Sequence, residues 1–187
     1  QIAIVGSRNP SSGGGENAYR FAEFLAANGF AITSGLALGV DAAAHQGALA
    51  AQGKTIAVMG TGLDMISPSR HRALAQQILE MGGALVSELP LGSGSKAANF
   101  PQRNRIISGL SCGVLVVEAA IQSGSLITAK AAMQQNREVF AIPGSIHNPL
   151  ARGCHQLIRQ GATLVETGQD IVDQLQGMLG FQREKLL

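Results

Sequence analysis

Seven short apolar runs alternate along this chain with amphipathic stretches long enough to form helices. Most of the runs are continuous Val, Ile, Leu and Ala without polar alternation, which predicts strands that are buried on both faces. Strands of that kind form a mostly parallel sheet with helices on both faces. The predicted strands are residues 2–5, 31–34, 55–59, 84–87, 114–117, 139–142 and 163–165.

Helices are predicted at residues 16–28, 40–51, 70–81, 125–135, roughly 154–160 and 171–179. Gly29, Gly53, Gly82 and Gly161 each follow one of them, where a left-handed residue is needed at low cost. Strand, helix, strand repetition with right-handed crossovers predicts a doubly wound α/β fold. The length of 187 residues suits one domain with a full core.

Composition places the chain in a broad class. A hydrophobic content of 45% and a net charge of +2 fit a globular protein. Cys112 and Cys154 are too few for a disulfide framework, so a reducing, cytoplasmic location is expected, and no apolar run is long enough for a membrane span. Because Gln1 stands directly before the first strand, we expect a fragment of a longer protein.

Basic residues are concentrated in one region. Residues 96–159 contain seven Lys or Arg and two acids, whereas the rest contains seven basic and ten acidic residues. Within that region, Phe100, Arg103, Asn104 and Arg105 fall on a loop and short helix. Arginine forks bind phosphate oxygens and an exposed Phe stacks on any base, so this run suits an anionic polymer with flat bases. A solvated helix start with Phe100 packed on the core is the alternative.

Small polar residues and glycine follow most of the predicted strands, as in Ser7-Arg8, Ser34-Gly35 and 123–128. Ligands of doubly wound sheets bind outside the carboxyl ends of the strands. Residues 123–125 are typical of a glycine turn and N-cap that open a helix. Converging helix N-termini with free N–H groups predict a phosphate site. Tight turns with ordinary Ser and Thr caps would explain any one of these loops, but five together less well.

The motifs of common cofactor sites are incomplete. Residues 13–18 can be read as G-x-G-x-x-A, but they lie several residues after the first strand, and the second strand ends in Ser34 rather than an acid, which argues against NAD. Residues 53–55 enter a strand, unlike a P-loop. Asp41 and His45 stand four apart on a predicted helix and could form an acid/base pair or hold a metal, but Asp41 is better explained as an acid that stabilises the helix dipole. No cofactor is expected.

Glu88 and Glu118 follow strands and are the candidates for general acid/base chemistry on an N-glycosidic bond. Since no Ser/His or Cys/His nucleophile pair accompanies them, we favour carboxylates that accept hydrogen bonds from loop N–H groups and order the basic residues nearby. Cys154-His155 lacks further ligands at metal spacing and is interpreted as an incidental pair. Neither a catalytic residue nor a metal is therefore expected.

A set of short motifs extends from about residue 2 to residue 165. The motifs are IVGSR at 4–8, SGLA at 34–37, GVDAAAH at 39–45, GLD at 62–64, SELP at 87–90, FPQRNRII at 100–107, VEA at 117–119, SGSLITA at 123–129 and AIPG at 141–144. In this order they resemble the DNA-processing protein A family (DprA, also called Smf). The resemblance covers nearly the whole chain.

The resemblance implies an extended Rossmann-like core at residues 1–180, with 181–187 starting a linker to an absent C-terminal domain. It implies a cytoplasmic protein that binds single-stranded DNA in natural transformation, protects incoming strands and loads the RecA recombinase, without being an enzyme. It also implies a homodimer with Leu157, Ile158 and Leu164 near the interface, although that segment can equally be plain core.

The expected DNA contacts divide by chemistry. In this hypothesis Arg8, Lys96, Arg103 and Arg105 line a positive groove, and Phe100 stacks on a base beside Asn104. The hydroxyl groups of Ser7, Ser34, Ser123 and Thr128 hold phosphates.

The rival function belongs to nucleoside-monophosphate phosphoribohydrolases of the same extended fold. Their signature is P-G-G-x-G-T-x-x-E, whereas residues 123–128 have no following Glu. A pure protein-interaction scaffold would leave the arginine cluster unexplained.

Overall fold

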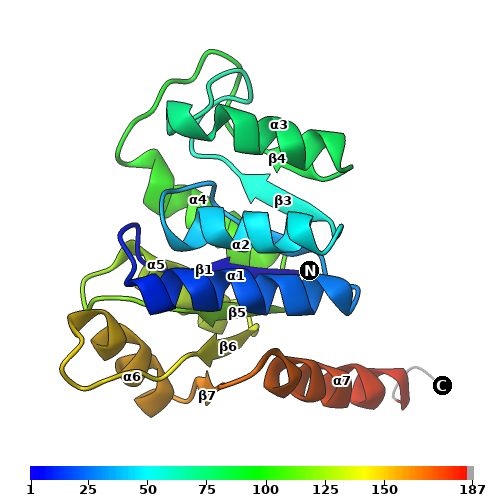
Figure 1. Ribbon diagram of the computed structural model, residues 1–187, viewed down its shortest axis with the longest axis vertical. Coiled ribbons are helices and arrows are strands. Elements are labelled where there is room, and N and C mark those ends of the chain that lie inside the picture. The colour runs from blue at the N-terminus through cyan, green and yellow to red at the C-terminus, as the bar shows by residue number, and fades with distance from the viewer. Residues whose placement is uncertain (185–187) are drawn as a thin grey trace.

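The computed structural model describes residues 1–184. Within them, seven strands form one sheet in the order β4-β3-β2-β1-β5-β6-β7, and every neighbouring pair is parallel (Figure 1). The strands are β1 (Ile2–Val5), β2 (Ile32–Ser34), β3 (Thr55–Val58), β4 (Ala84–Val86), β5 (Gly113–Val116), β6 (Glu138–Ala141) and β7 (Thr163–Leu164). The predicted doubly wound, Rossmann-like α/β fold is confirmed, with a sheet that is entirely parallel.

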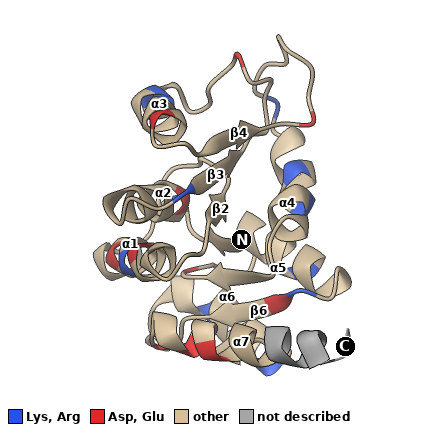
Figure 2. Ribbon diagram, turned by 90° about the vertical axis from the view of Figure 1, so that its right-hand side faces the viewer, with Lys and Arg blue, Asp and Glu red and all other residues tan. Residues whose placement is uncertain are grey.

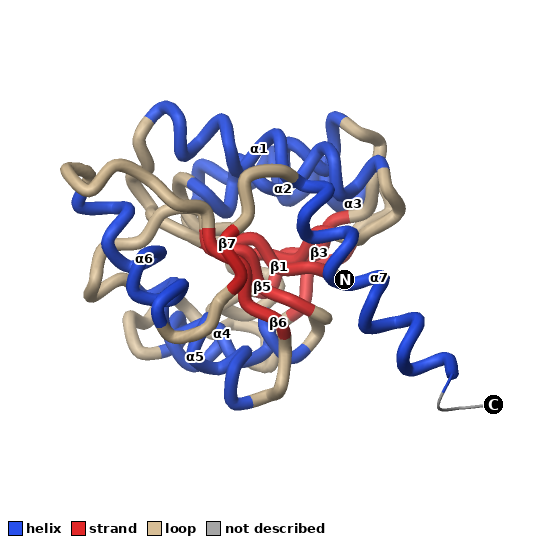
Figure 3. The backbone as a smooth tube through the Cα atoms, turned by 90° about the horizontal axis from the view of Figure 1, so that it is seen from below, coloured by secondary structure: helices blue, strands red, loops and turns tan. Residues whose placement is uncertain are grey.

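Helices cover both faces of this sheet (Figure 3). The helices are α1 (Ser12–Ala27), α2 (Val40–Ala50), α3 (Arg72–Glu80), α4 (Asn99–Gly109), α5 (Gly124–Gln134), α6 (Arg152–Arg159) and α7 (Gly168–Glu184), with short 3₁₀ turns η1 (Ser69–His71) and η2 (Pro149–Ala151). α1, α2, α3 and α7 pack on one face, and α4, α5 and α6 pack on the other.

The central strand β1 shows why its sequence is apolar throughout. Ile2 and Ile4 face the core cluster that includes α1 and α2, whereas Ala3 and Val5 face the cluster of α5 and α6. All four residues are buried. Alternate side chains of a strand point to opposite faces, so a strand between two helical layers needs apolar residues at every position.

The chain reverses its direction of travel across the sheet next to β1. From β1 it proceeds outward through β2 and β3 to β4, and α4 then returns it to β5 on the other side of β1. Ligands of doubly wound sheets bind at such a switch point, outside the carboxyl ends of the strands. A ligand site is therefore expected at the loops after β1 and β5.

Several helix boundaries differ from the sequence-based expectation, including the starts of α1 and α6 and the end of α7. α1 begins at Ser12 rather than residue 16, because the Ser11 hydroxyl caps the glycine-rich first turn by accepting from Gly14 N–H at 3.0 Å. α6 begins at Arg152, directly after η2. α7 continues through Glu184, so residues 181–184 of the predicted linker are helical, and residues 185–187 lie outside the described residues.

No helix among residues 1–184 combines the length and the apolar character that crossing a bilayer would require.

Candidate nucleic-acid interface

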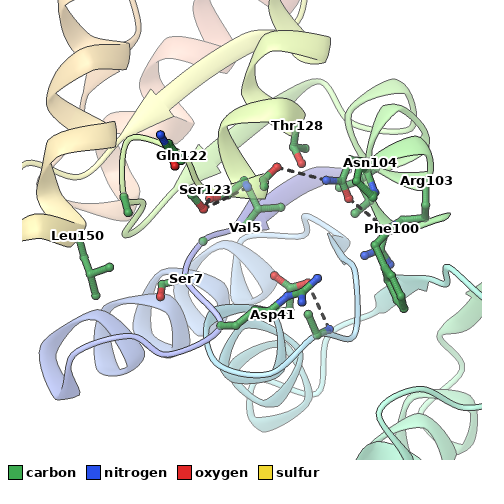
Figure 4. Close-up of a pocket in the computed structure, with 18 residues that line it drawn as sticks. Val5, Ser7, Asp41, Phe100, Arg103, Asn104, Gln122, Ser123, Thr128 and Leu150 are labelled. Atoms are coloured by element: carbon green, nitrogen blue, oxygen red, sulfur yellow. Dashed lines mark hydrogen bonds between the residues drawn. The ribbon is translucent and has the colours of Figure 1, made fainter. Parts of the chain in front are cut away.

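A cleft of about 490 Å³ opens at the switch point, beside the carboxyl ends of β1 and β5 (Figure 4). The loops after β1, β2 and β5 line it, together with α4. It brings together most of the predicted contact residues: Ser7, Arg8, Phe100, Arg103, Asn104, Ser123 and Thr128. Ser34, Lys96 and Arg105 are not among the described residues that line it.

Arg103 belongs to the wall of the cleft and is not a free cation. Its side chain is buried, with 4% of the residue exposed. Nη1 donates to Gly35 O at 2.8 Å and to Val58 O, and Nε donates to Asn104 Oδ1 at 3.1 Å. The Nε and Nη1 donors of Arg103 therefore hold Asn104 and the carboxyl ends of β2 and β3, so this side chain is part of the wall, and its predicted contact with the DNA backbone stays a prediction.

Asp41 stands opposite Arg103 in the same wall. Its Oδ2 accepts hydrogen bonds from Gly35 N at 3.0 Å and from Ala37 N at 3.3 Å, which orders the loop after β2. Burial raises the pKa of Asp41, and the charge of Arg103 opposes that rise. A Cβ on Gly35 would stand 2.7 Å from both Arg103 Nη2 and Asp41 Oδ2, so the two side chains approach across a glycine.

Asp41 lies in the first turn of α2, as predicted, but its hydrogen-bond donors are in the loop after β2, and its role toward the helix dipole stays a prediction. His45 Nδ1 lies 2.6 Å from Thr55 Oγ1. Both side chains are buried, and their partners are separate.

Phe100 lies between packing and exposure. Its ring covers Gly60, where a Cβ would come within 2.8 Å of Phe100 Cδ1, and the residue is half-buried. The guanidinium carbons of Arg8 and Arg103 each lie 5.8 Å from the ring centroid, which is cation–π distance. Unlike Arg103, Arg8 is exposed. Packing on the protein and partial exposure therefore coexist at Phe100.

The N-terminus of α5 forms another side of the cleft. Ser123 is the N-cap, as predicted, and its Oγ accepts from Ser125 N at 3.3 Å. Asn104 Nδ2 donates to Gly124 O at 3.3 Å and so ties α4 to this turn. Thr128 lines the cleft one turn further on and is buried. The positive end of the α5 dipole thus faces the cleft beside hydroxyl groups, an arrangement that attracts anions.

Three predicted contacts lie elsewhere. Ser34 is fully buried and its Oγ donates to Ile4 O at 2.6 Å, so the expectation that this hydroxyl holds a phosphate is wrong. Arg105 is exposed on α4, where it pairs with Glu88, and Lys96 is exposed on the β4–α4 loop. Blue segments on α4 in Figure 2 show that this helix carries basic residues. Of the four predicted groove cations, Arg8 alone is both exposed and part of the cleft lining.

The two candidate acids are engaged in internal contacts, as the favoured interpretation predicts. Glu88 pairs with Arg105. Glu118 is buried, and its carboxylate accepts from Ser11 N at 2.8 Å and from Ser11 Oγ at 2.6 Å. Each acid therefore orders a loop or a basic side chain next to the cleft.

Cys154 and His155 have separate partners. Cys154 is buried beside the carbonyl oxygens of Val116 and Val117, and burial raises the pKa of its thiol to about 12. His155 Nε2 accepts from Gly144 N at 3.1 Å. Within residues 1–184 no group of His, Cys, Asp or Glu has the arrangement of a metal site.

The predicted interface residues divide between core and surface. Leu157 is 4% exposed and belongs to the core cluster beneath α6, so it is corrected from interface to core. Ile158 is half-buried against the same cluster. Leu164 lies on β7, at the edge of the sheet, with 46% of its surface exposed.

The sequence and the fold of this chain are similar to those of known proteins. The family model for DNA recombination-mediator protein A matches residues 1–176. The chain belongs to this family, DprA/Smf. The resemblance found in the motifs is thus confirmed.

Individual DprA/Smf proteins are similar to this chain in sequence and in structure. Protein Smf of Escherichia coli K12 is 57% identical over 176 residues, which is 94% of this chain and 47% of Smf. A solved structure of DprA from Streptococcus pneumoniae matches with a TM-score of 0.86 and 47% identity, over 92% of this chain and 60% of that one. The chain therefore spans about half to three fifths of these two relatives.

A further DprA structure is described by its single-stranded DNA binding mode. This protein, from Helicobacter pylori, matches with a TM-score of 0.84 and 30% identity, over 94% of this chain and 80% of its own.

Other residues of this DprA/Smf cleft have no strong sequence signal. Gln122, Ala120 and Pro101 line it beside the predicted residues. Gln122 directly precedes Ser123, the N-cap of α5. Residues between a strand end and a helix cap border the ligand region of such sheets, so the position of Gln122 in the sequence could have indicated that it lines the cleft.

Proposed function

We propose that this chain binds single-stranded DNA in the cleft at the switch point, without sequence preference and without chemistry. The observation that carries the proposal is the pairing at the cleft mouth of exposed Arg8 with the half-buried ring of Phe100, 5.8 Å apart. A guanidinium suits a phosphate and the face of an aromatic ring suits a base, which is the combination that single-strand binders use. The H. pylori relative, described with single-stranded DNA, supports the same ligand.

Each part of the cleft has a role in this proposal. Arg8 holds a backbone phosphate, and the N–H groups at the start of α5 hold a second phosphate with Ser123 and Ser125. Phe100 stacks on a base. Arg103 is a positioning residue that supports Phe100 and the loop after β2, and Lys96 and Arg105 add positive potential outside the cleft.

The wider role that we propose is protection of incoming strands in natural transformation and loading of the RecA recombinase in the cytoplasm. The family's description as a recombination mediator supports this role. We also propose a homodimer that uses the β7 edge, because β7 offers unpaired strand groups and the exposed side chain of Leu164. Replacing Leu164 by Arg is expected to convert dimer to monomer in analytical ultracentrifugation. RecA assembly on a DNA strand, with and without the chain, tests the loading role.

The hydrolase alternative has less support. Hydrolysis of a glycosidic bond would need a carboxylate that can contact the substrate. The Glu118 carboxylate instead accepts hydrogen bonds from Ser11 and from Asn148. We therefore propose a binding protein rather than an enzyme. Release of free base from nucleoside monophosphates by the purified chain would reverse this choice.

Fluorescence anisotropy tests DNA binding directly. A labelled poly-dT strand is titrated beside a duplex of equal length, with the variants Arg8→Ala and Arg137→Ala. Arg137 is a matched control, because it carries the same charge at the amino end of β6, whereas the cleft lies at the carboxyl ends of the strands.

We expect tighter binding to the single strand, about ten-fold weaker binding by Arg8→Ala, and little change for Arg137→Ala. If about three phosphates are neutralised, the logarithmic salt slope is about −2. Affinity that does not depend on salt, or equal losses in both variants, would contradict the proposal.

A further inference from the structure

One residue fastens both ends of the loop that carries Arg8. Ser7 N donates to the backbone oxygen of Glu118 at 2.7 Å. Ser11 N donates to Glu118 Oε2 at 2.8 Å, and the Ser11 hydroxyl donates to Oε1 at 2.6 Å. Arg8 lies between these two attachment points. The position of its guanidinium at the cleft mouth therefore depends on Glu118, which stands 110 residues later in the chain.

The Glu118 carboxylate also lies over the N-terminus of α1. Ser11 Oγ, which donates to the carboxylate, accepts from Gly14 N at 3.0 Å, and a Cβ on Gly14 would overlap the carboxylate itself. The first turn of α1 contains no acidic residue of its own. In Rossmann-like sheets this helix N-terminus, after the first strand, is where a nucleotide phosphate binds. Here a side chain of the protein supplies the anion.

The carboxylate is enclosed and well satisfied. Only 8% of Glu118 is exposed, and Asn148 Nδ2 donates to Oε1 at 3.3 Å in addition to the two donors of Ser11. A buried carboxylate with this many donors is held by charge-assisted hydrogen bonds, which are stronger than those of a neutral acceptor. The site is thus built for a negative charge as well as for a shape.

We propose that Glu118 is a built-in anion: it occupies the phosphate position of α1 and positions the Arg8 loop for the DNA backbone. The positioning role rests on the proposed function, whereas the occupied anion position does not. The first turn of α1 and Glu118 are not among the described residues that line the cleft, so we expect strand phosphates at Arg8 and at the N-terminus of α5, which do line it. Glu118 would then determine specificity by keeping a nucleotide phosphate away from α1.

Chemical rescue tests the anion position without DNA. Glu118→Ala leaves the donors of Ser11 and Asn148 around a space that suits a small carboxylate. Thermal unfolding is measured in chloride and in acetate at equal ionic strength. We expect acetate to raise the Tm of Glu118→Ala by about 3 °C more than that of the wild-type chain, as for a ligand specific to the folded state.

Two further variants serve as controls. Leu175→Ala removes a buried side chain of α7 and reports the general effect of acetate on a destabilised chain. Glu118→Gln keeps the size of the side chain without its charge, so a Tm equal to that of the wild type in this variant would overturn the anion position even if Glu118→Ala does not fold. It is expected to lower the Tm without rescue by acetate, because its amide fills the space.

DNA affinity tests the positioning role. Glu118→Ala is expected to bind poly-dT about ten-fold more weakly than the wild type in chloride, and acetate should recover most of this loss. A folded Glu118→Ala chain with wild-type affinity would overturn the positioning role. Equal acetate effects on Glu118→Ala and Leu175→Ala would overturn the anion position. If the wild-type chain does not bind DNA, the proposed function and the positioning role both fail, while the unfolding experiment still decides on the anion position.

Discussion

The inner wall and the mouth of the cleft each place an arginine 5.8 Å from the Phe100 ring, in opposite environments. In the inner wall, Arg103 is buried and donates to the carbonyl oxygens of Gly35 and Val58, with Asp41 nearby. At the mouth, Arg8 is exposed and lies on a loop held by Glu118. The difference shows that a count of cations does not separate buried arginines from accessible ones. Burial and hydrogen-bond partners distinguish Arg103, which builds the wall, from Arg8, the arginine that we propose meets DNA.

The largest expected effect comes from breaking the inner wall with Arg103→Met. The change removes the donors of Gly35 O and Val58 O and leaves Asp41 buried without its cation. Breaking a buried charged network in this way costs about 3 to 5 kcal/mol of unfolding free energy. Urea unfolding measures the loss, and Arg137→Met, at an exposed site, is the control. A loss as small as that of the control would show that the wall does not depend on Arg103.

The pH dependence of that loss has a definite sign. Burial raises the pKa of Asp41, so the contribution of this group to stability is present at low pH and is lost as the pH rises through its folded pKa. Without Arg103 the pKa of Asp41 rises further. The penalty of Arg103→Met is therefore expected to be larger at about pH 7.5 than at about pH 4.5, and Asp41→Asn should reduce it at the higher pH. A penalty independent of pH would contradict the coupling.

His45, behind the same wall, predicts a loss of stability in acid. Thr55 Oγ1 donates to Ile32 O, so His45 Nδ1 is the donor to Thr55, and His45 Nε2 is a buried atom without a partner among the described residues. Burial, together with the charges of His71 and Arg103, lowers the pKa of His45 to about 3.

A lowered pKa means that the contribution of His45 is present above its unfolded pKa and is lost as the pH falls toward 3, at up to about 1.4 kcal/mol per pH unit. His45→Leu is expected to flatten the decline of unfolding free energy between about pH 6 and pH 4. An unchanged slope would assign acid sensitivity to other groups.

At the mouth, Phe100→Leu sharpens the comparison by removing the aromatic ring while an apolar side chain still covers Gly60. We expect a loss of about 1 kcal/mol or more in binding of poly-dT, from the range for one stacked base. Thermal unfolding checks that the fold is retained. Wild-type affinity in a folded variant would reduce Phe100 to a packing residue.

The smallest effect is expected outside the cleft, where Arg105 pairs with Glu88 on the surface. Glu88→Gln removes an acid and releases Arg105, so DNA affinity is expected to rise about two-fold through the added positive potential. Because exposed ion pairs contribute little, unfolding free energy should change by less than about 0.5 kcal/mol. A lower affinity would mean that Glu88 positions Arg105 for the strand.

The sequence predicts features that depend on neighbouring residues. The buried pattern of β1 and the Ser123 cap of α5 are local, and both are confirmed. The role of Arg103 is not local, because its acceptors Gly35 and Val58 stand 68 and 45 residues away in the chain. The same holds for Ser34, whose acceptor on β1 becomes known only from the pairing of β1 and β2.

Two further differences have physical causes. The first turn of α1 contains three consecutive glycines, which are poor helix formers, so the sequence does not predict this turn. Its N-cap, Ser11, donates to the carboxylate of Glu118, which stands 107 residues away in the chain. Leu157 and Leu164 are both apolar, so composition does not separate core from edge. Their positions on α6 and on the edge strand β7 do.

Arginine side-chain NMR during titration with a short poly-dT strand tests the central claim most directly, because it observes Arg8 and Arg103 separately in one sample. We expect the Nε–Hε signal of Arg8 to shift and to saturate as DNA is added. Because Arg103 Nε donates to Asn104 Oδ1, its Nε–Hε signal should be visible before DNA is added and should shift little during the titration. A large shift of Arg103 with an unchanged Arg8 would contradict the assignment of Arg103 to the wall and of Arg8 to the DNA.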